Sequence, residues 1–162
     1  RASIEAVLAH LDAQIAHVTQ LIRQHLDQHP GLRAQRDLLT TIPGIGEATA
    51  AVLLAELFDK PFTRARQAAA FAGLVPRLVQ SGTLSGRSRL SKIGPGRLRK
   101  ALYFPAVTAL RWNPTIRAVR QRLQAAGKPP MVIIGAAMRK LIHLAYGVHK
   151  SKKAYEPTWS PS

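Results

Sequence analysis

Residues 3–29 carry apolar positions at alternating intervals of four and three, which is the heptad spacing of a coiled coil. Ser3 is a suitable helix cap, and His29-Pro30-Gly31 is a suitable stop. A helix of this length reaches about 40 Å, too far for one small core to cover. We therefore expect residues 1–31 to form an oligomerisation arm rather than a helix lying along its own domain. The seam runs through Ile4, Leu8, Leu11, Ile15, Val18, Ile22 and His25.

Shorter helical patterns follow, separated by glycine and proline. The expected helices span about 33–40, 47–58, 63–73 with Thr63 as cap, 95–112, 114–127 and 131–150. The segment 74–94 is rich in glycine and serine and predicts a loop or loose hairpin. Trp112 is assigned to the core. The chain from Ser151 onward is expected to be disordered unless Tyr155 or Trp159 docks, and 156–162 is a tail outside the helical domain. The predicted class is all-α, a long N-terminal helix followed by a compact helical domain over 32–155.

The composition of the chain excludes several classes of function. The chain has 162 residues, a net charge of +16 and no cysteine, which excludes a disulfide scaffold, a thiolate-rich zinc site and cysteine catalysis. Uninterrupted apolar runs such as 131–138 are too short to span a bilayer. Because the chain begins with Arg1 rather than Met, we expect a piece of a longer protein.

The positive charge is concentrated in the second part of the chain. Residues 1–59 hold 4 basic and 7 acidic side chains, a net of −3, whereas residues 60–162 hold 20 basic and 1 acidic, a net of +19. Such a block cannot neutralise itself and favours a polyanionic partner. Nucleic acid is the leading interpretation, and a ribosomal or anionic-lipid partner remains open.

A first candidate site is the turn Ile42-Pro43-Gly44-Ile45-Gly46, with Ala50 after it. It resembles the turn of a helix-hairpin-helix motif, here over 38–58, in which Gly44, Ile45 and Gly46 would bring backbone amides to a phosphate. The alternative is a structural hairpin that contacts nothing. Glu47 and Glu56 lie nearby and oppose phosphate binding.

A second candidate site is the Gly/Ser/Arg segment, where glycines near Ser81 leave its hydroxyl accessible for attack on phosphorus. Arg77, Arg87 and Arg89 are close enough in sequence to hold phosphate oxygens. On spacing alone, a serine-rich phosphate-binding loop is the favoured explanation of the segment. Further cations expected to bind nucleic acid are Lys92, Arg97, Arg99, Lys100, Arg117, Arg120 and Arg122.

The last helix carries a polar stripe of Arg139, His143, Tyr146 and Lys150. We interpret it as a solvated helix face, with a phosphate grip and a tyrosine strand-transfer site as alternatives. Tyr146 or Tyr103 would serve as the tyrosine nucleophile. A Ser-His-Asp triad is not supported, since no Asp follows Asp59 and most histidines lie in the N-terminal helix.

Five separated blocks give the chain a resemblance to a known family. They are Ile42–Gly46, Phe71-x-Gly73-Leu74-x-Pro76-Arg77, Gln80-Ser81-Gly82, Lys92-x-Gly94-x-x-x-Leu98-Arg99 and Arg139-Lys140-Leu141. Over roughly residues 38–155 the chain resembles the C-terminal domain of the insertion-sequence 110/116/902 family of bacterial transposases. The resemblance implies a DNA recombinase with Ser81 as nucleophile, a coiled-coil arm and a structured guide RNA. Arg139 and Lys140 are further candidates for nucleic-acid binding.

The resemblance also implies an N-terminal RuvC-like domain with four acidic ligands for Mg²⁺. The 8 acidic residues of this chain are scattered, so we expect no metal site here and no cleavage by this piece alone. The predicted partners are DNA, a guide RNA and further copies of the chain, with a cytoplasmic, nucleoid-associated location. A non-catalytic module for nucleic-acid binding and oligomerisation is the alternative function.

Overall fold

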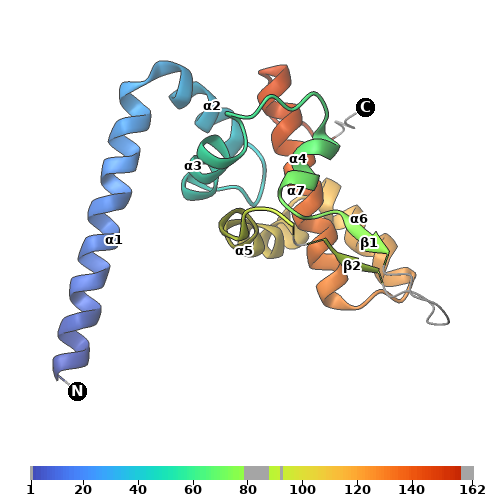
Figure 1. The fold of residues 1–162 in the computed structure, drawn as a ribbon, viewed down its shortest axis with the longest axis horizontal. Coiled ribbons are helices and arrows are strands. Elements are labelled where there is room, and N and C mark those ends of the chain that lie inside the picture. Colours follow the sequence, from blue (N-terminus) through green and yellow to red (C-terminus); the bar gives the residue numbers. More distant parts are fainter. Residues whose placement is uncertain (1, 79–87, 92, 158–162) are drawn as a thin grey trace.

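The computed structural model describes residues 2–78, 88–91 and 93–157. Within them the chain forms a long helix followed by a bundle of shorter helices, which confirms the all-α class (Figure 1). The helices are α1 (Ala2–Gln28), α2 (Pro30–Thr40), α3 (Glu47–Glu56), α4 (Ala65–Phe71), α5 (Gly96–Trp112), α6 (Pro114–Ala125) and α7 (Pro130–Ser151). Strands β1 (Pro76–Leu78) and β2 (Ser88–Leu90) pair antiparallel, with Arg77 opposite Arg89. This short ribbon matches the loose hairpin predicted for 74–94.

Helix α7 is the centre of the bundle, and α4, α5 and α6 pack against it. Its buried side includes Leu141, Ile142 and Leu144, and Lys152 ends it in a left-handed conformation with φ 55°. By length and mean hydropathy α7 resembles a membrane-spanning helix. The lengths of its uninterrupted apolar runs do not reveal this, because polar residues divide the helix into short runs. However, 61% of its most apolar stretch is buried inside the protein. Its hydrophobicity is that of a core helix.

The turn between α2 and α3 packs tightly on α5. Gly44 has φ 107°, and a Cβ there would lie 2.7 Å from Ala109 Cβ and 2.8 Å from the Pro105 carbonyl oxygen. Only glycine fits this backbone conformation and this spacing. The glycine thus allows α3 and α5 to approach each other.

Asn113 joins three parts of the chain at the end of α5. Its Oδ1 accepts from the amide of Ile116 and caps α6, while its Nδ2 donates to the Pro43 carbonyl. The Tyr155 hydroxyl donates to the same Oδ1, and the Tyr155 amide donates to Thr41 Oγ1. Tyr155 therefore docks the segment that follows α7, which is one of the two contacts that the predicted order of the tail depended on. The other candidate, Trp159, lies outside the described residues.

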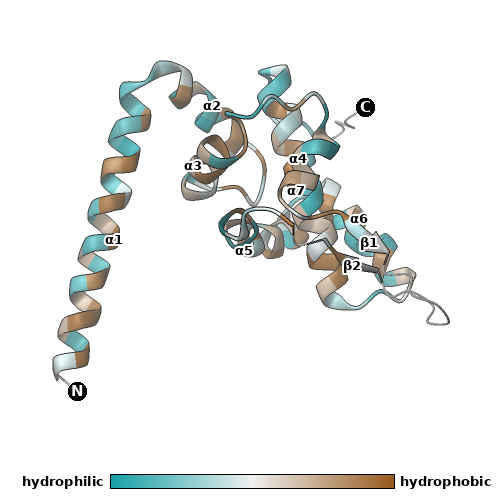
Figure 2. Cartoon of the chain, viewed as in Figure 1, coloured by the Kyte–Doolittle hydropathy of each residue, from teal (hydrophilic) through white to brown (hydrophobic). Residues whose placement is uncertain are grey.

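The helix α1 projects from the bundle (Figure 1). Its apolar residues are 47–66% exposed, and Figure 2 shows them spaced along the helix. The alternative of a helix lying along its own domain is therefore wrong. At its base Leu26 is buried, Arg23 pairs with Glu47, and the buried Arg36 of α2 donates to Asp27 at 2.8 Å.

Some boundaries differ from expectation. Helix α2 begins at Pro30 rather than 33, because proline is well suited to a first helical position. Helix α4 begins at Ala65, with Arg64 rather than Thr63 at the cap position. The side-chain oxygen of Gln67 accepts from the amides of both Thr63 and Arg64, so the glutamine closes this helix start.

Trp112 is 64% exposed, so its assignment to the core is wrong. The buried side of α5 is already filled by Leu98, Leu102, Ala106 and Ala109. The indole stacks instead under the Arg111 guanidinium, 5.2 Å from the ring centroid. The low aromatic content of the chain says nothing about where a particular ring lies.

A candidate nucleic-acid interface

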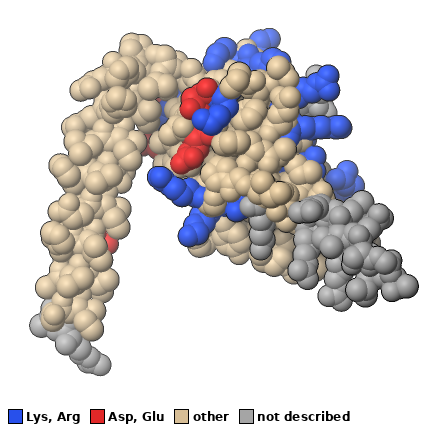
Figure 3. Space-filling view, in the orientation of Figure 1, with Lys and Arg blue, Asp and Glu red and all other residues tan. Residues whose placement is uncertain are grey.

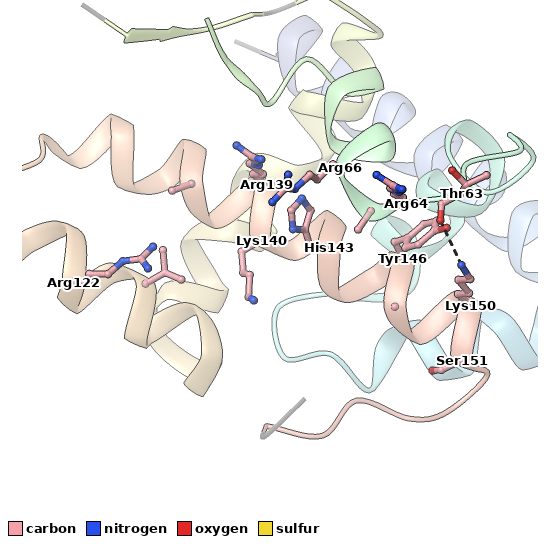
Figure 4. A pocket seen from close by; sticks show the side chains of 14 residues that line it. Thr63, Arg64, Arg66, Arg122, Arg139, Lys140, His143, Tyr146, Lys150 and Ser151 are labelled. Atoms are coloured by element: carbon pink, nitrogen blue, oxygen red, sulfur yellow. Dashed lines mark hydrogen bonds between the residues drawn. The ribbon is translucent and has the colours of Figure 1, made fainter. Parts of the chain in front are cut away.

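A groove of about 870 Å³ opens between α4, α6 and α7 (Figure 4). It is lined from the α4 side by Thr63, Arg64, Ala65 and Arg66, from α6 by Val119 and Arg122, and from α7 by Ala136, Arg139, Lys140, His143, Tyr146, Gly147, Lys150 and Ser151. Its volume lies within the range of ligand-binding pockets, roughly 300–1,000 Å³. Residues 63–66 therefore share one concave surface with α6 and α7, which follow much later in the chain.

The lining is cationic. It contains Arg64, Arg66, Arg122, Arg139, Lys140 and Lys150, and no Asp or Glu. Among the described residues, none of these six side chains takes part in an ion pair. A groove whose positive charges have no internal counter-ion attracts anions.

Two titratable side chains respond to this positive surface. Burial, together with Arg139, Lys140 and Arg66, lowers the pKa of His143 to about 4. Burial and the neighbouring Arg122 lower the pKa of Lys140. His143 is thus neutral near pH 7, and its buried Nε2 has no hydrogen-bond partner within the described part of the chain. Figure 4 shows Arg139 and Arg66 converging on His143 from α7 and α4.

The polar stripe on α7 is not the solvated face that its spacing suggested. Arg139 and His143 are half-buried and Tyr146 is buried, because α4 packs across this side of α7. The Tyr146 hydroxyl donates to the Phe62 carbonyl oxygen at 2.9 Å. A tyrosine held in this way is a poor candidate nucleophile. Tyr103 is half-buried on α5, in edge contact with Phe104.

The structure separates the predicted residues of the α2–α3 turn by role. Gly44 contacts α5, and Ile45 is buried with its amide donating to the Ile42 carbonyl. Gly46 is open and occupies the cap position of α3. Beside it, Glu47 pairs with Arg23. Phosphate binding at this turn stays a prediction.

The catalytic candidate Ser81 lies outside the described residues, as do Arg87 and Lys92. For Arg77 and Arg89 the structure gives the backbone register alone, opposite each other in the β1–β2 pair. Their predicted roles are therefore untested.

The remaining predicted cations lie in the groove, on or beside α5, or, for Arg117 and Arg120, exposed on α6 outside the groove. Arg139 and Lys140 line the groove, together with Arg122. Arg97 and Lys100 are exposed on α5, and Arg97 lies 3.8 Å from Glu56. Arg99 donates to the carbonyls of Ala72 and Gly94, so it fixes the chain before α5.

Sequence reasoning missed Arg64 and Arg66, which supply the α4 side of the groove. Arg64 immediately precedes the seven-residue helix α4 and Arg66 lies in its first turn, and so short a helix shows little periodicity. Their charge was counted in the basic block, but nothing local indicated that they face α7. A fold was needed to find them.

The described residues hold no group of three or more His, Asp or Glu that could bind a metal ion. The residues present therefore do not fit the Mg²⁺ that the family resemblance implies. We derive no catalytic step through a metal in this chain.

Comparison with known proteins decides the family. Residues 36–121 match the profile of the transposase IS116/IS110/IS902 family. The chain belongs to this transposase family. The match covers part of the helical bundle. Figure 3 shows Lys and Arg spread over this bundle, while few charges lie on the visible face of the arm.

Individual relatives are similar along most of the chain. A pilin gene-inverting protein of Moraxella bovis is 35% identical over 160 residues, covering 93% of this chain and 50% of the relative. A protein of insertion element IS110 of Streptomyces coelicolor is 30% identical over 132 residues, covering 81% and 32%. A protein of insertion element IS900 of Mycobacterium paratuberculosis is 25% identical over 149 residues, covering 91% and 36%. The chain thus spans half the length, or less, of these relatives.

Proposed function

We propose that this chain is the nucleic-acid-binding C-terminal part of a transposase that breaks and rejoins DNA strands. The observation that carries the proposal is the groove between α4, α6 and α7, a cationic surface without carboxylates in a member of a transposase family. We place it in the cytoplasm with nucleoid DNA. A guide RNA is a further proposed partner, which the resemblance alone supports.

The groove suits a phosphodiester backbone. Arginine forks bind phosphate oxygens in pairs, and lysine adds charge with little geometric demand. Contacts of this kind position a protein on a strand without reading its sequence. Arg66 comes from α4 and Arg139 from α7, and both point toward His143, so a phosphate bound there would be held from two elements.

The experiment for the groove compares two charge reversals by duplex binding in a salt series. Arg139→Glu removes a groove cation, and we expect it to weaken binding at least ten-fold and to flatten the salt dependence by about two phosphate contacts. Arg33→Glu is the matched control, because Arg33 is exposed on α2 and does not line the groove. Equal losses in both variants would mean that net charge alone determines binding.

For the chemistry, the Ser81 hydroxyl oxygen attacks a DNA phosphorus. An O–P bond to serine forms, the strand's bridging O–P bond breaks, and the departing strand oxygen takes a proton while the serine proton is lost. The phosphoserine ester keeps the bond energy for rejoining to another strand. Arg77, Arg87 and Arg89 would stabilise the extra negative charge at phosphorus. The roles of Ser81 and of these arginines are supported by the sequence alone.

Trapping the protein–DNA adduct of the full-length protein tests this assignment. Ser81→Ala should abolish the adduct and leave duplex binding unchanged. Peptide mapping of the wild-type adduct should locate the phosphate on Ser81. An adduct on Tyr103 or Tyr146, or one of undiminished yield in the variant, contradicts the serine assignment.

The non-catalytic alternative also has a specific observation in its favour. The described residues lack a metal-binding carboxylate cluster, so this chain by itself is suited to binding rather than cleavage. Absence of any adduct in the full-length protein would favour a binding and oligomerisation module.

We further propose that α1 pairs with α1 of another copy. Its exposed apolar side recurs with heptad spacing over 27 residues, long enough for a stable coiled coil. Leu11→Glu together with Val18→Glu should shift the mass in solution to that of a monomer, as measured by analytical ultracentrifugation. The double variant Ala9→Glu/Ala16→Glu, off the seam, should keep the oligomer.

A further inference from the structure

One side of α5 faces away from the core and combines aromatic and cationic residues. At 100° per residue, six exposed apolar or basic residues fall within an arc of about 140°. They are Arg97, Lys100, Phe104, Val107, Arg111 and Trp112. The buried residues of α5, such as Leu102 and Ala106, occupy the opposite side of the helix. We call these six residues the α5 outer face.

The aromatic residues of this face are unusually open. Phe104 is 76% exposed and Trp112 is 64% exposed, and Val107 between them is 41% exposed. Large aromatic side chains gain substantial free energy when they leave water, so open rings on one helix side indicate a binding surface. The two rings lie eight residues apart, about 12 Å along the helix axis.

The charges of the face favour an anionic partner. Arg111 sits over the Trp112 ring at 5.2 Å, and Lys100 and Arg97 lie one to two turns before Phe104. Among the described ion pairs, only that of Arg97 with Glu56 involves this face. Arg111 and Lys100 therefore keep their charges available beside the rings.

We propose that the α5 outer face binds unpaired nucleotides of a single strand, with bases stacked on Phe104 and Trp112 and phosphates beside Lys100 and Arg111. The proposal rests on the proposed nucleic-acid binding of this chain. A duplex offers phosphates but keeps its base faces stacked inside, so it leaves the two rings in water. A single strand offers both chemistries, and stacking on aromatic rings is tolerant of sequence. Strand breakage and rejoining creates such unpaired nucleotides.

Tryptophan fluorescence gives a direct test, because the chain has only two tryptophans, Trp112 and Trp159. In a Trp159→Phe background the emission reports on Trp112 alone. Titration with an oligothymidine of about 15 nucleotides should quench this emission. A strand of equal length and charge without bases should bind at least ten-fold more weakly and quench little.

Substitutions separate stacking from charge. Trp112→Leu and Phe104→Leu should each weaken oligothymidine binding by about ten-fold, since stacking contributes about 1–3 kcal/mol per base and 1.4 kcal/mol is ten-fold. Trp112→Phe should restore most of the affinity. Met131→Ala is the matched control, because Met131 is an exposed apolar residue on α7, and it should bind as the parent does. The unfolding temperature of each variant checks that the fold is retained.

An unchanged emission, equal binding of the strand without bases, or a Trp112→Leu variant that binds normally would each overturn the inference. A Trp112→Leu variant that loses self-association instead would assign the face to a protein partner and also overturn it. If the duplex binds through the groove in these cases, the proposed function stands. If neither duplex nor single strand binds, the proposed function fails first.

Discussion

The α2–α3 turn and the groove between α4, α6 and α7 illustrate two ways in which a basic protein can suggest a phosphate site. The turn has the glycines of a phosphate-binding motif within five consecutive residues, yet its Gly44 contacts Ala109 and Pro105 of α5. The groove has no local motif and draws its cations from three elements. In this fold Gly44 serves packing, whereas the cations of the groove, which form no ion pairs among the described residues, come together only through tertiary structure.

The largest effect should come from Gly44→Ala. The left-handed backbone costs about 1–2 kcal/mol for alanine, and forcing a methyl group against α5 costs a further 1–3 kcal/mol or so. We expect denaturant unfolding to show a loss of about 2–5 kcal/mol. Duplex affinity of the folded variant should not change, and a large loss of affinity at full stability would return the turn to a phosphate-binding role.

Asn113→Ala should destabilise the protein by about 2–3 kcal/mol, through loss of the α6 cap and of the bonds to Pro43 and Tyr155. Thermal unfolding measures this loss. Asn113→Asp is the control, because it keeps the cap and the acceptor for Tyr155 but cannot donate to Pro43. Its loss should be smaller, and an equal loss would contradict the importance of the cap.

The groove predicts a pH dependence. The pKa of His143 is near 4 in the fold, against about 6.5 in the unfolded chain. The unfolded chain therefore binds more protons below pH 6.5, and stability decreases as the pH falls from about 6.5 towards 4. His143→Gln should reduce this decrease by several degrees of unfolding temperature. His17→Gln, on the exposed arm, should leave the decrease unchanged; if His143→Gln does so too, the positive surroundings of the imidazole are not as described.

Gly46→Ala should have the smallest effect, below about 1 kcal/mol. Gly46 has an extended backbone and nothing within 4 Å of an added Cβ, and alanine is only a weaker cap than glycine. Duplex affinity should also be unchanged. A loss of affinity in this variant, at unchanged stability, would locate a phosphate at the start of α3 and reverse the comparison.

The sequence predicted the parts of the fold that depend on local chemistry. Pro30 follows the end of α1 and Gly73 follows the end of α4, as expected. Asn113 caps α6, as the sequence Asn113-Pro114 suggested. The burial of side chains, which depends on contacts between distant parts of the chain, was predicted less well. Trp112 was placed in the core, and the α7 stripe in solvent, because periodicity says which residues share a side but not what covers that side.

The candidate site shows the same limit. Arg139 and Lys140 were identified from the family blocks, whereas Arg66 joins them only because α4 packs on α7. Sixty or more residues separate these positions along the chain, and no pattern links them. Ser81 is a candidate from the sequence alone, because it lies outside the described residues.

The ion-paired joint at the base of α1 gives the arm a mechanical property. Arg36, nearly enclosed, bonds Asp27 on one side and Asp37 on the other, so the last turn of the arm is fastened to α2. With 27 residues the arm is about 40 Å long, and a tilt of 10° at this joint moves the far tip by about 7 Å. Because of its length, the arm converts a small change of angle at this joint into a large displacement of its tip relative to the bundle.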